Sequence, residues 1–318
     1  MSITQQALSV IIVTYNSASV VEAAILGLPS DCEIIVVDNA STDSTLDILQ
    51  AAPRDLTILP RSDNAGFAKA VNQGAKQATG DYLLLLNPDA RIDESAVASV
   101  LDHLAHNPEM GIASPLVVEG DGALKTLAAG HEPTIWRMLT HATGLSRLSS
   151  GSDILRGHYL LRGQLGDQPE RDVSWVSGGC MFVRRQAWEQ LGGLTERWFM
   201  YAEDVEFCLR AKAAGFGVRV IVSAKAYHAV GMSSVSTDSY QAPRTVWLEN
   251  LFDLYRLRYQ AGPVRSFAWR SVVGLGFAAR ALVATLKASV SGHHSSHDSR
   301  RFHAYAAAML RPKAVSRG

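Results

Sequence analysis

Two aspartates stand directly after apolar segments that have the composition of buried strands. Asp38 ends the segment CEIIVVD, and Asp89 follows YLLLL after an Asn-Pro dipeptide. In an open α/β sheet, ligands bind beyond the carboxyl ends of the strands. A carboxylate there can accept the imide N–H of uracil or thymine. Asn-Pro-Asp is also ordinary turn chemistry, and a lone Asp38 is a loop or capping residue in most proteins, so neither decides the function alone.

An acidic pair and a histidine further along could serve proton transfer or ligand binding. Glu203 and Asp204 fall in the first turn of a helix predicted over 204–214. Acids at that position gain about 0.3 to 1 kcal/mol from the helix dipole without any catalytic role. His228 follows a strand predicted over 217–223. A single histidine after a strand is more often structural than a ligand.

Two glycine-containing segments could approach a ligand closely. The loop at 64–74, NAGFAKAVNQG, leads into a helix; Gly66 could bring the backbone near a ligand, and the helix N-terminus could face phosphate. A capped surface helix is the alternative explanation. Gly178 and Gly179 interrupt a strand predicted over 173–184, which is typical of a bulge or of ligand approach. Trp175 could stack on a sugar or fill the core.

A sheet whose strands alternate with helices is needed to bring these residues to one place. Strands are predicted at 9–16, 32–38, 57–60, 82–86 and 111–118, and helices at 19–27, 44–51 and 94–106, with Ser41, Thr42 or Asp43 as the cap of the second helix. This order predicts βαβ units and a mainly parallel, Rossmann-like sheet of the α/β class. Neither G-x-G-x-x-G nor G-x-x-x-x-G-K-[ST] follows the first strand, so the dinucleotide and P-loop interpretations lose their main support.

The composition bounds the class of protein. The 318 residues, 47% of them hydrophobic, suffice for one large α/β domain or for one domain with an appendage. Lys+Arg and Asp+Glu are equal at 30 each, which gives no overall bias towards nucleic acid. Cys32, Cys180 and Cys208 have no metal-ligand spacing and form no disulfide framework, which fits a reducing cytoplasm. The N-terminal apolar segment lacks a basic flank and is expected to be a strand, not a signal peptide.

The C-terminal section is basic. The segment 244–260 is predicted to be an amphipathic helix, and 267–290 is a longer apolar one. Arg270, Arg280 and Lys287 interrupt the second segment, so a helix in the membrane interface is expected in place of a spanning one. Packing against the main domain or a second subunit remains the alternative. Between the two halves, 119–172 is expected to be a long insertion around the active site, with a short helix near Trp136 to Leu139.

Four motifs, SVIIVTYN, VDNASTDST, NAGFAKAVNQG and GDYLLLLNPDA, occur in this order. Together they resemble the family 2 inverting glycosyltransferases with a GT-A fold, most closely the bacterial rhamnosyltransferase-like members. The resemblance covers residues 9–234. It implies a GT-A domain at 1–240, with a nucleotide-sugar-binding half (1–118) and an acceptor and catalytic half (119–240), followed by a basic amphipathic helical extension at 241–318.

The resemblance also implies roles for single residues. Asp204 would be the general base, with Glu203 as its neighbour or substitute. Asp89 and His228 would hold a divalent metal, Mg²⁺ or Mn²⁺. The nucleotide sugar would be bound by Thr14, Tyr15, Asn16, Asp38, Asn64, Phe67, Asn72, Asn87 and Asp89; the acceptor or donor sugar would contact Trp175, Ser177, Gly178 and Gly179, and Ser233 and Ser234 would contact phosphate. The first Asp of the family's DxD motif is Asn87 here, so Asp89 is the only charged ligand that this motif supplies.

The implied reaction is inverting sugar transfer. A carboxylate takes the proton of an acceptor hydroxyl as that hydroxyl attacks the anomeric carbon, while the departing nucleoside diphosphate needs charge neutralisation. The expected donor is dTDP-L-rhamnose. The expected acceptor is a lipid-linked saccharide or polysaccharide of the cell envelope, reached from the cytoplasmic face of a bacterial membrane. A UDP-hexose donor, a non-catalytic nucleotide-sugar-binding partner and a homodimer remain alternatives to be tested.

Overall fold

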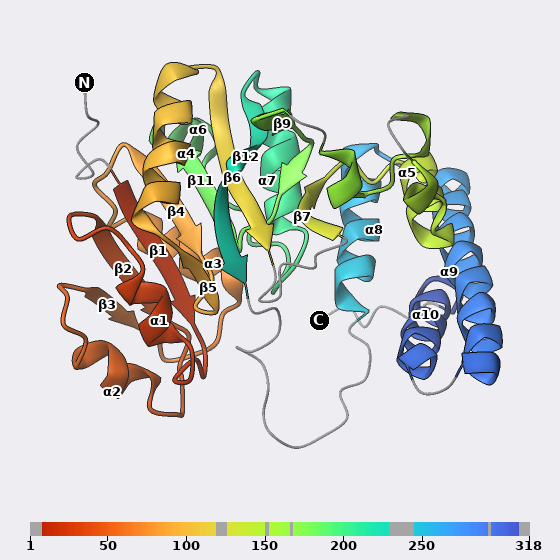
Figure 1. Ribbon diagram of the computed structural model, residues 1–318, viewed down its shortest axis with the longest axis horizontal. Helices are drawn as coiled ribbons and strands as arrows, with labels where there is room; N and C mark the ends of the chain where they lie inside the picture. Colours follow the sequence, from red (N-terminus) through yellow and green to blue (C-terminus); the bar gives the residue numbers. More distant parts are fainter. Residues whose placement is uncertain are drawn as a thin grey trace. The chain divides into compact units, whose positions relative to one another are not determined.

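The computed structural model divides into two compact units (Figure 1). It describes residues 8–118, 126–149, 153–165, 168–228, 245–291 and 294–311. The sheet unit comprises Met1–Ala129 and Leu165–Asp238, and the helical unit comprises Gly130–Gln164 and Ser239–Gly318.

The sheet unit is built on one mixed sheet, whose strand order in the described residues is β3-β2-β1-β4-β11-β6-β12-β5, with β9 paired to β12. The strands are β1 (Leu8–Thr14), β2 (Glu33–Asp38), β3 (Thr57–Pro60), β4 (Tyr82–Leu86), β5 (Ala90–Ile92), β6 (Met110–Val118), β9 (Glu170–Asp172), β11 (Cys180–Arg184) and β12 (Gly217–His228). β3, β2, β1 and β4 are parallel, as predicted. β11 lies antiparallel between β4 and β6. The carboxyl ends of β1, β2 and β4 therefore share one edge with the start of β11.

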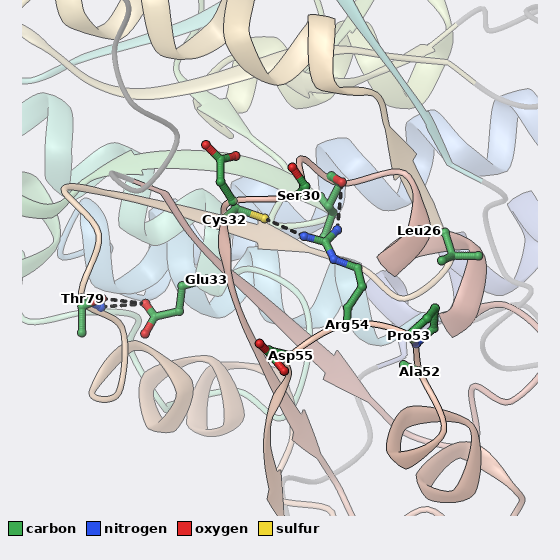
Figure 2. Close-up of a pocket in the computed structure, with 11 residues that line it drawn as sticks. Leu26, Ser30, Cys32, Glu33, Ala52, Pro53, Arg54, Asp55 and Thr79 are labelled. Atoms are coloured by element: carbon green, nitrogen blue, oxygen red, sulfur yellow. Dashed lines mark hydrogen bonds between the residues drawn. The ribbon is translucent and has the colours of Figure 1, made fainter.

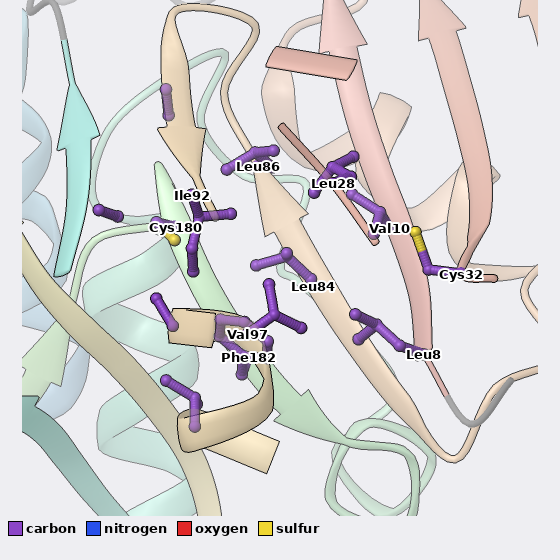
Figure 3. Close-up of a cluster of buried hydrophobic side chains, with 14 of the residues drawn as sticks. Leu8, Val10, Leu28, Cys32, Leu84, Leu86, Ile92, Val97, Cys180 and Phe182 are labelled. Atoms are coloured by element: carbon purple, nitrogen blue, oxygen red, sulfur yellow. The ribbon is translucent and has the colours of Figure 1, made fainter. Parts of the chain in front are cut away.

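Helices flank this sheet and bury their apolar faces on it. They are α1 (Val21–Leu26), α2 (Thr45–Gln50), α3 (Phe67–Ala75), α4 (Glu94–His106), α6 (Arg185–Leu191) and α7 (Glu203–Ala213). Every residue of β4 is buried, which explains its unbroken apolar sequence. Figure 3 shows Leu84 and Leu86 of β4 packed with Val97 of α4 and Phe182 of β11. A smaller sheet pairs β7 (Thr126–Gly130) with β10 (Trp175–Val176).

The Asn87-Pro88-Asp89 segment forms a tight turn, in which the Ala90 N–H donates to the Asn87 carbonyl at 3.0 Å. The chain then continues as β5, which the sequence did not predict. β5 pairs antiparallel with the end of β12, so that Ala90 lies opposite His228. The turn expected from the sequence is real, and it delivers Asp89 to the carboxyl end of β12.

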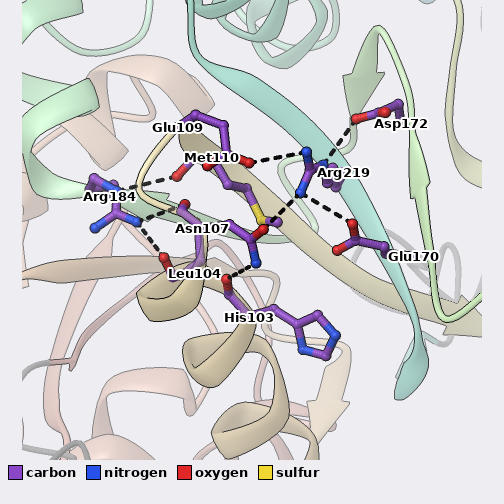
Figure 4. A network of polar contacts seen from close by, with 9 residues as sticks. All are labelled: His103, Leu104, Asn107, Glu109, Met110, Glu170, Asp172, Arg184 and Arg219. Atoms are coloured by element: carbon purple, nitrogen blue, oxygen red, sulfur yellow. Dashed lines mark hydrogen bonds and ion pairs between the residues drawn. The ribbon is translucent and has the colours of Figure 1, made fainter.

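Arginines fix the opposite end of β12 (Figure 4). Arg219, near the start of the strand, forms ion pairs at 3.0 to 3.1 Å with Glu109, Glu170 and Asp172. Arg184 donates to the carbonyls of Leu104, Asn107 and Met110, which satisfies backbone acceptors at and beyond the end of α4. These contacts hold β12 in register beside β6 and β9.

The helical unit contains α5 (Ile135–Thr143), α8 (Val246–Arg258), α9 (Pro263–Ser291) and α10 (His294–Leu310), with short elements η2 (Leu145–Leu148), η3 (Asp153–Leu155), β8 (Tyr159–Leu161) and η4 (Arg162–Gln164). Its core is aromatic, with Tyr255, Trp269 and Phe277 fully buried. The short helix expected near Trp136 is α5. The helix expected at 267–290 begins earlier, because Pro263 is favoured in the first turn of a helix. α10 was not predicted.

Candidate active site

The carboxyl ends of β1 and β2 form a closed polar corner. The Asp38 carboxylate is fully buried and accepts hydrogen bonds from the Thr14 hydroxyl at 2.7 Å, the Ser41 N–H at 2.9 Å and the Ser41 hydroxyl at 2.5 Å. The Asn16 side-chain oxygen accepts from the Thr42 N–H at 2.8 Å. Ser41 and Thr42, expected only as possible helix caps, instead tie the two strand ends together. Since three donors already occupy Asp38, its main visible role is to shape this corner.

The loop before α3 contacts the polypeptide more closely than expected. Gly66 has φ +86°, and a Cβ added to it would lie 2.3 Å from the Phe199 carbonyl oxygen. The Phe67 N–H, the first donor of α3, bonds that same carbonyl at 2.9 Å. The close approach predicted for Gly66 is therefore to the backbone of Phe199, and this donor is not free for phosphate. The Asn64 side chain accepts from the Gly66 N–H at 3.2 Å.

Asn72 also holds the chain. Its side-chain amide donates to the Leu194 carbonyl at 2.9 Å and to Glu196 at 3.0 Å, and its oxygen accepts from the Leu194 N–H at 3.0 Å. The donor and acceptor groups of the Asn72 side chain are thus occupied by residues 194–196, which lead to Glu203 and Asp204. Tyr15, by contrast, is 45% exposed beside the corner at Asp38, where a ligand could reach it.

Gly178 and Gly179 lie between the acidic pair and the ends of β4 and β12. A Cβ at Gly178 would lie 3.0 Å from the Phe67 ring and 3.7 Å from the Asp204 Cβ. A Cβ at Gly179 would lie 3.2 Å from the Asn87 amide nitrogen and 3.6 Å from the His228 ring. Asn87 N–H donates to the Gly179 carbonyl at 3.0 Å. A side chain at either glycine would therefore press on its neighbours at closer than normal contact distance.

Trp175 precedes the two glycines in β10. It is only 3% exposed, so it fills the core of the smaller sheet and presents no open face to a sugar. Of the two interpretations that the sequence left open, the structure favours the core residue.

The acidic pair begins α7. Asp204 is partly exposed, and its carboxylate accepts from the Gly178 N–H at 3.0 Å and from the Val205 N–H at 2.7 Å. Glu203 is 3% exposed, and its Oε2 has no hydrogen-bond partner among the described residues. Burial raises the pKa of both carboxyl groups, and together with the charge of Asp204 it raises that of Glu203 to about 8. Asp204 accepts two backbone N–H groups, whereas the buried Oε2 of Glu203 has no partner among the described residues, so the negative charge is assigned to Asp204 and the proton to Glu203.

The backbone before this pair is strained. Tyr201 and Ala202 have φ values of +70° and +79°, a left-handed conformation that costs non-glycine residues roughly 1 to 2 kcal/mol each. The contacts of Phe199 with Phe67 and of Asn72 with Leu194 hold the segment that contains the strain. Sequence reasoning missed this feature because neither tyrosine nor alanine favours the left-handed region.

The third part of the site lies at the ends of β4 and β12. His228 Nε2 lies 2.9 Å from the Asp89 Oδ1 and 3.3 Å from the Asn87 amide. The Asp89 side chain is almost fully buried. A hydrogen bond to Asp89 requires the proton on Nε2, whereas a metal ion would need the lone pair of that same nitrogen.

Asp89 and His228 are the two candidate ligands for a divalent ion in this corner. Two ligands at right angles, each about 2.1 Å from the same ion, lie about 3 Å apart, which matches the separation between Asp89 and His228. Within the described part of the chain, no group of three or more His, Cys, Asp and Glu side chains could hold a metal. The remaining ligands would therefore have to be diphosphate oxygens and water. Ser233 and Ser234, expected as phosphate contacts, lie outside the described residues.

A groove of about 1030 Å³ lies elsewhere in the sheet unit, near the start of β2 (Figure 2). None of the predicted site residues lines it. Arg54, at its centre, donates to the carbonyls of Ile25, Leu28 and Pro29. That arginine is occupied in closing loops, so the groove is not the candidate active site.

The chain matches two models of known families. The model of glycosyl transferase family 2 matches residues 9–192, and that of glycosyl transferase family group 2 matches residues 149–310. The chain is a family 2 glycosyltransferase. The first match contains Asp38, Asp89 and the two adjacent glycines, and the second contains Asp204 and His228.

Two curated relatives of this glycosyltransferase are named as sugar transferases. It is 29% identical over 238 residues to the N-acetylglucosaminyl-diphospho-decaprenol L-rhamnosyltransferase of Mycobacterium tuberculosis, covering 70% of this chain and 75% of the relative. It is 25% identical over 215 residues to the low-salt glycan biosynthesis hexosyltransferase Agl10 of Haloferax volcanii, covering 66% and 63% of the two chains.

Solved structures confirm the GT-A fold that the sequence predicted. The mannosyltransferase PcManGT from Pyrobaculum calidifontis, in complex with GDP-Man and Mn²⁺, superposes with a TM-score of 0.60 at 19% identity, covering 96% of this chain and 86% of that one. GalNAc-T7 with UDP, GalNAc and Mn²⁺ gives 0.53 at 14% identity, covering 92% and 54%. At these identities the likeness concerns the fold.

Proposed function

We propose that this glycosyltransferase moves L-rhamnose from dTDP-L-rhamnose to a lipid-linked saccharide, with inversion, in the synthesis of a cell-envelope glycan. The observation that carries the proposal is the similarity to the L-rhamnosyltransferase, which extends over 75% of that relative. That relative is named for an acceptor in which N-acetylglucosamine is linked through diphosphate to decaprenol. The three free, buried cysteines support a cytoplasmic location.

In this proposal Asp204 accepts the proton of the acceptor hydroxyl. The Gly178 and Val205 N–H groups keep the Asp204 carboxylate charged and oriented, and its partial exposure leaves it reachable. Glu203 keeps its proton, so the carboxylate beside it stays the single negative charge of the pair. The hydroxyl oxygen attacks the anomeric carbon from the face opposite the leaving diphosphate, which inverts the configuration.

The donor would bind between the strand ends at Asp38 and the corner at Asp89. The exposed Tyr15 and Asn16, beside the buried corner of Thr14, Asp38 and Ser41, would contact the base and ribose. Asp89 and His228, with the Asn87 amide, would hold a divalent metal. When bound, such an ion neutralises the charge that develops on the departing diphosphate.

A donor panel tests the proposal directly. Purified full-length protein is given dTDP-L-rhamnose, UDP-glucose, UDP-N-acetylglucosamine or GDP-mannose with a polyprenyl-diphosphate-linked N-acetylglucosamine, and nucleoside diphosphate release and lipid product are measured. Turnover that requires dTDP-L-rhamnose is expected. Transfer from a UDP-hexose alone would refute the donor assignment, and nucleotide binding without release from any donor would favour the non-catalytic alternative.

A UDP-hexose donor is the second candidate. The similarity to Agl10, named a hexosyltransferase, favours it. Calorimetric titration of dTDP and UDP distinguishes the two nucleotides, because they differ only in the ribose 2′-hydroxyl and the base methyl. The rhamnose proposal expects the tighter binding for dTDP.

A further inference from the structure

Helix α9 of the helical unit has two apolar faces. Trp269, Val273, Phe277 and Ala281 form the inner face and are fully buried, and α9 packs there against α5 and α10. The outer face carries apolar side chains that are 51% to 82% exposed: Val264, Phe267, Leu275, Leu282, Val283 and Leu286. Exposed apolar surface on this scale marks a binding surface.

Arg270 and Arg280, the two arginines within the apolar part of α9, lie on its inner side. The Arg270 guanidinium donates to the Met309 carbonyl at 2.9 Å, and Arg280 lies 4.2 Å over the Phe302 ring and donates to the His141 carbonyl at 3.3 Å. The sequence interpretation treated these arginines as interruptions of an apolar segment. The structure turns both inward, so no charged side chain stands on the outer face between Phe267 and Leu286.

The shape of the outer face fits a lipid surface better than a second helix. A two-stranded coiled coil uses a narrow seam flanked by charged residues that pair across it. Here the apolar arc is wide, because Phe267, Val272, Ala279 and Val283 extend it to both sides of Leu275. A wide apolar face along a helix in the interface plane is what a monotopic membrane contact requires.

Charge indicates the kind of lipid. In the described residues of the helical unit there are thirteen Lys and Arg and five Asp and Glu. The helical unit of a second copy would carry the same positive charge and would repel this one. An anionic bilayer would attract it. Phe267 also lines a groove of about 700 Å³ with Phe252, Met309 and exposed Arg256, where a lipid phosphate could lie beside the apolar face.

Length alone would allow α9 to span a bilayer, since Pro263–Lys287 is long and apolar enough. A third of that window is buried within the protein, however, and Arg270 and Arg280 are fixed to neighbouring helices. We propose that the helical unit docks on an anionic membrane surface through the outer face of α9, with the helix lying in the interface plane. This inference does not depend on which sugar the active site transfers.

Vesicle flotation of the full-length protein tests the inference. Vesicles of phosphatidylcholine are compared with vesicles that also contain phosphatidylglycerol, at low and high salt. Wild-type protein is expected to float with the anionic vesicles, and less so at high salt. The double variant Leu275→Glu/Leu282→Glu should bind at least about tenfold more weakly, because burying even one leucine changes a binding constant by about that factor or more.

The matched control is Leu26→Glu, which introduces the same charge at a 54% exposed leucine of α1 in the sheet unit. It should float like the wild type, and all three proteins should have equal melting temperatures. Equal flotation of the double variant and the wild type would overturn the proposal. A second result would also overturn it: a wild-type protein that is dimeric and does not bind vesicles, and a double variant that is monomeric. The outer face of α9 would then be an interface between copies.

Discussion

Replacing Glu203 by glutamine gives a sharp test of how the acidic pair shares its proton. Glu203 is buried beside Asp204, and its Oε2 has no partner among the described residues. Glutamine has nearly the shape of the neutral acid but does not ionise. If Glu203 is protonated at pH 7, the variant should keep turnover within about tenfold of the wild type, whereas a lost general base costs about 10²- to 10⁴-fold.

The raised pKa of Glu203 determines how strongly the stability of the protein depends on pH. The pKa of Glu203 is raised from 4.5 to about 8 by burial and by the charge of Asp204. Between these values the native protein binds a proton that the unfolded chain has released, so the free energy of unfolding falls as pH rises. The slope is about 1.4 kcal/mol per pH unit, or roughly 2 to 3 kcal/mol from pH 6 to 8. For a protein of this size that corresponds to a decrease in melting temperature of roughly 3 to 5 °C.

Differential scanning calorimetry from pH 5.5 to 8.5 measures this decrease in the wild type and in Glu203→Gln. The variant should show a clearly flatter dependence, because its neutral amide contributes no proton linkage. Equal slopes of melting temperature against pH in the two proteins would contradict a protonated Glu203. So would a loss of activity in Glu203→Gln as large as that in Asp204→Asn at pH 7, since Glu203 would then be acting as a carboxylate.

Three further predictions concern other parts of the site. Asp204→Asn should lower turnover by about 10²- to 10⁴-fold with little change in donor affinity, measured by nucleotide release and calorimetry; an active variant would remove Asp204 as the base. His228→Ala should weaken Mn²⁺-dependent binding of dTDP by roughly 10- to 100-fold while leaving metal-free binding unchanged; equal losses with and without Mn²⁺ would contradict the metal corner. Gly66→Ala should destabilise the protein by at least about 2 kcal/mol, because the added Cβ meets the Phe199 carbonyl at 2.3 Å. Gly192→Ala is its control, with φ +72° but nothing within 4 Å, and comparable denaturant midpoints for the two variants would refute the steric argument.

The fold was largely predictable because its signals are local. The apolar run of β4 and the alternation of strands and helices require no knowledge of distant contacts, and they placed Asp38 and Asp89 at strand ends. β5 escaped prediction because three residues carry too little periodicity. α10 escaped because its sequence is rich in His and Ser, while its stability comes from packing on α9.

The site was predictable only in part. The sequence marked Gly178 and Gly179 as a bulge or a place of ligand approach, and only the structure shows that they lie beside Asn87 and Asp204. The sequence could not show that Gly66 and Asn72 face the chain itself, because their partners lie more than 100 residues away in the sequence. Nor could the sequence show the role of Ser41. Its hydroxyl has the same local chemistry whether it caps a helix or completes the corner at Asp38.

The Gly178-Gly179 peptide has a consequence for how such an enzyme can change its substrates. One side of this peptide holds Asp204 through the Gly178 N–H, and the other holds Asn87 through the Gly179 carbonyl. The distance between Asp204, the proposed base, and Asn87, at the proposed diphosphate site, is therefore set by main-chain atoms. Substitutions around Thr14 or Tyr15 could adapt the protein to another nucleotide and leave that distance unaltered, so recognition of the donor and geometry of the reaction can evolve separately.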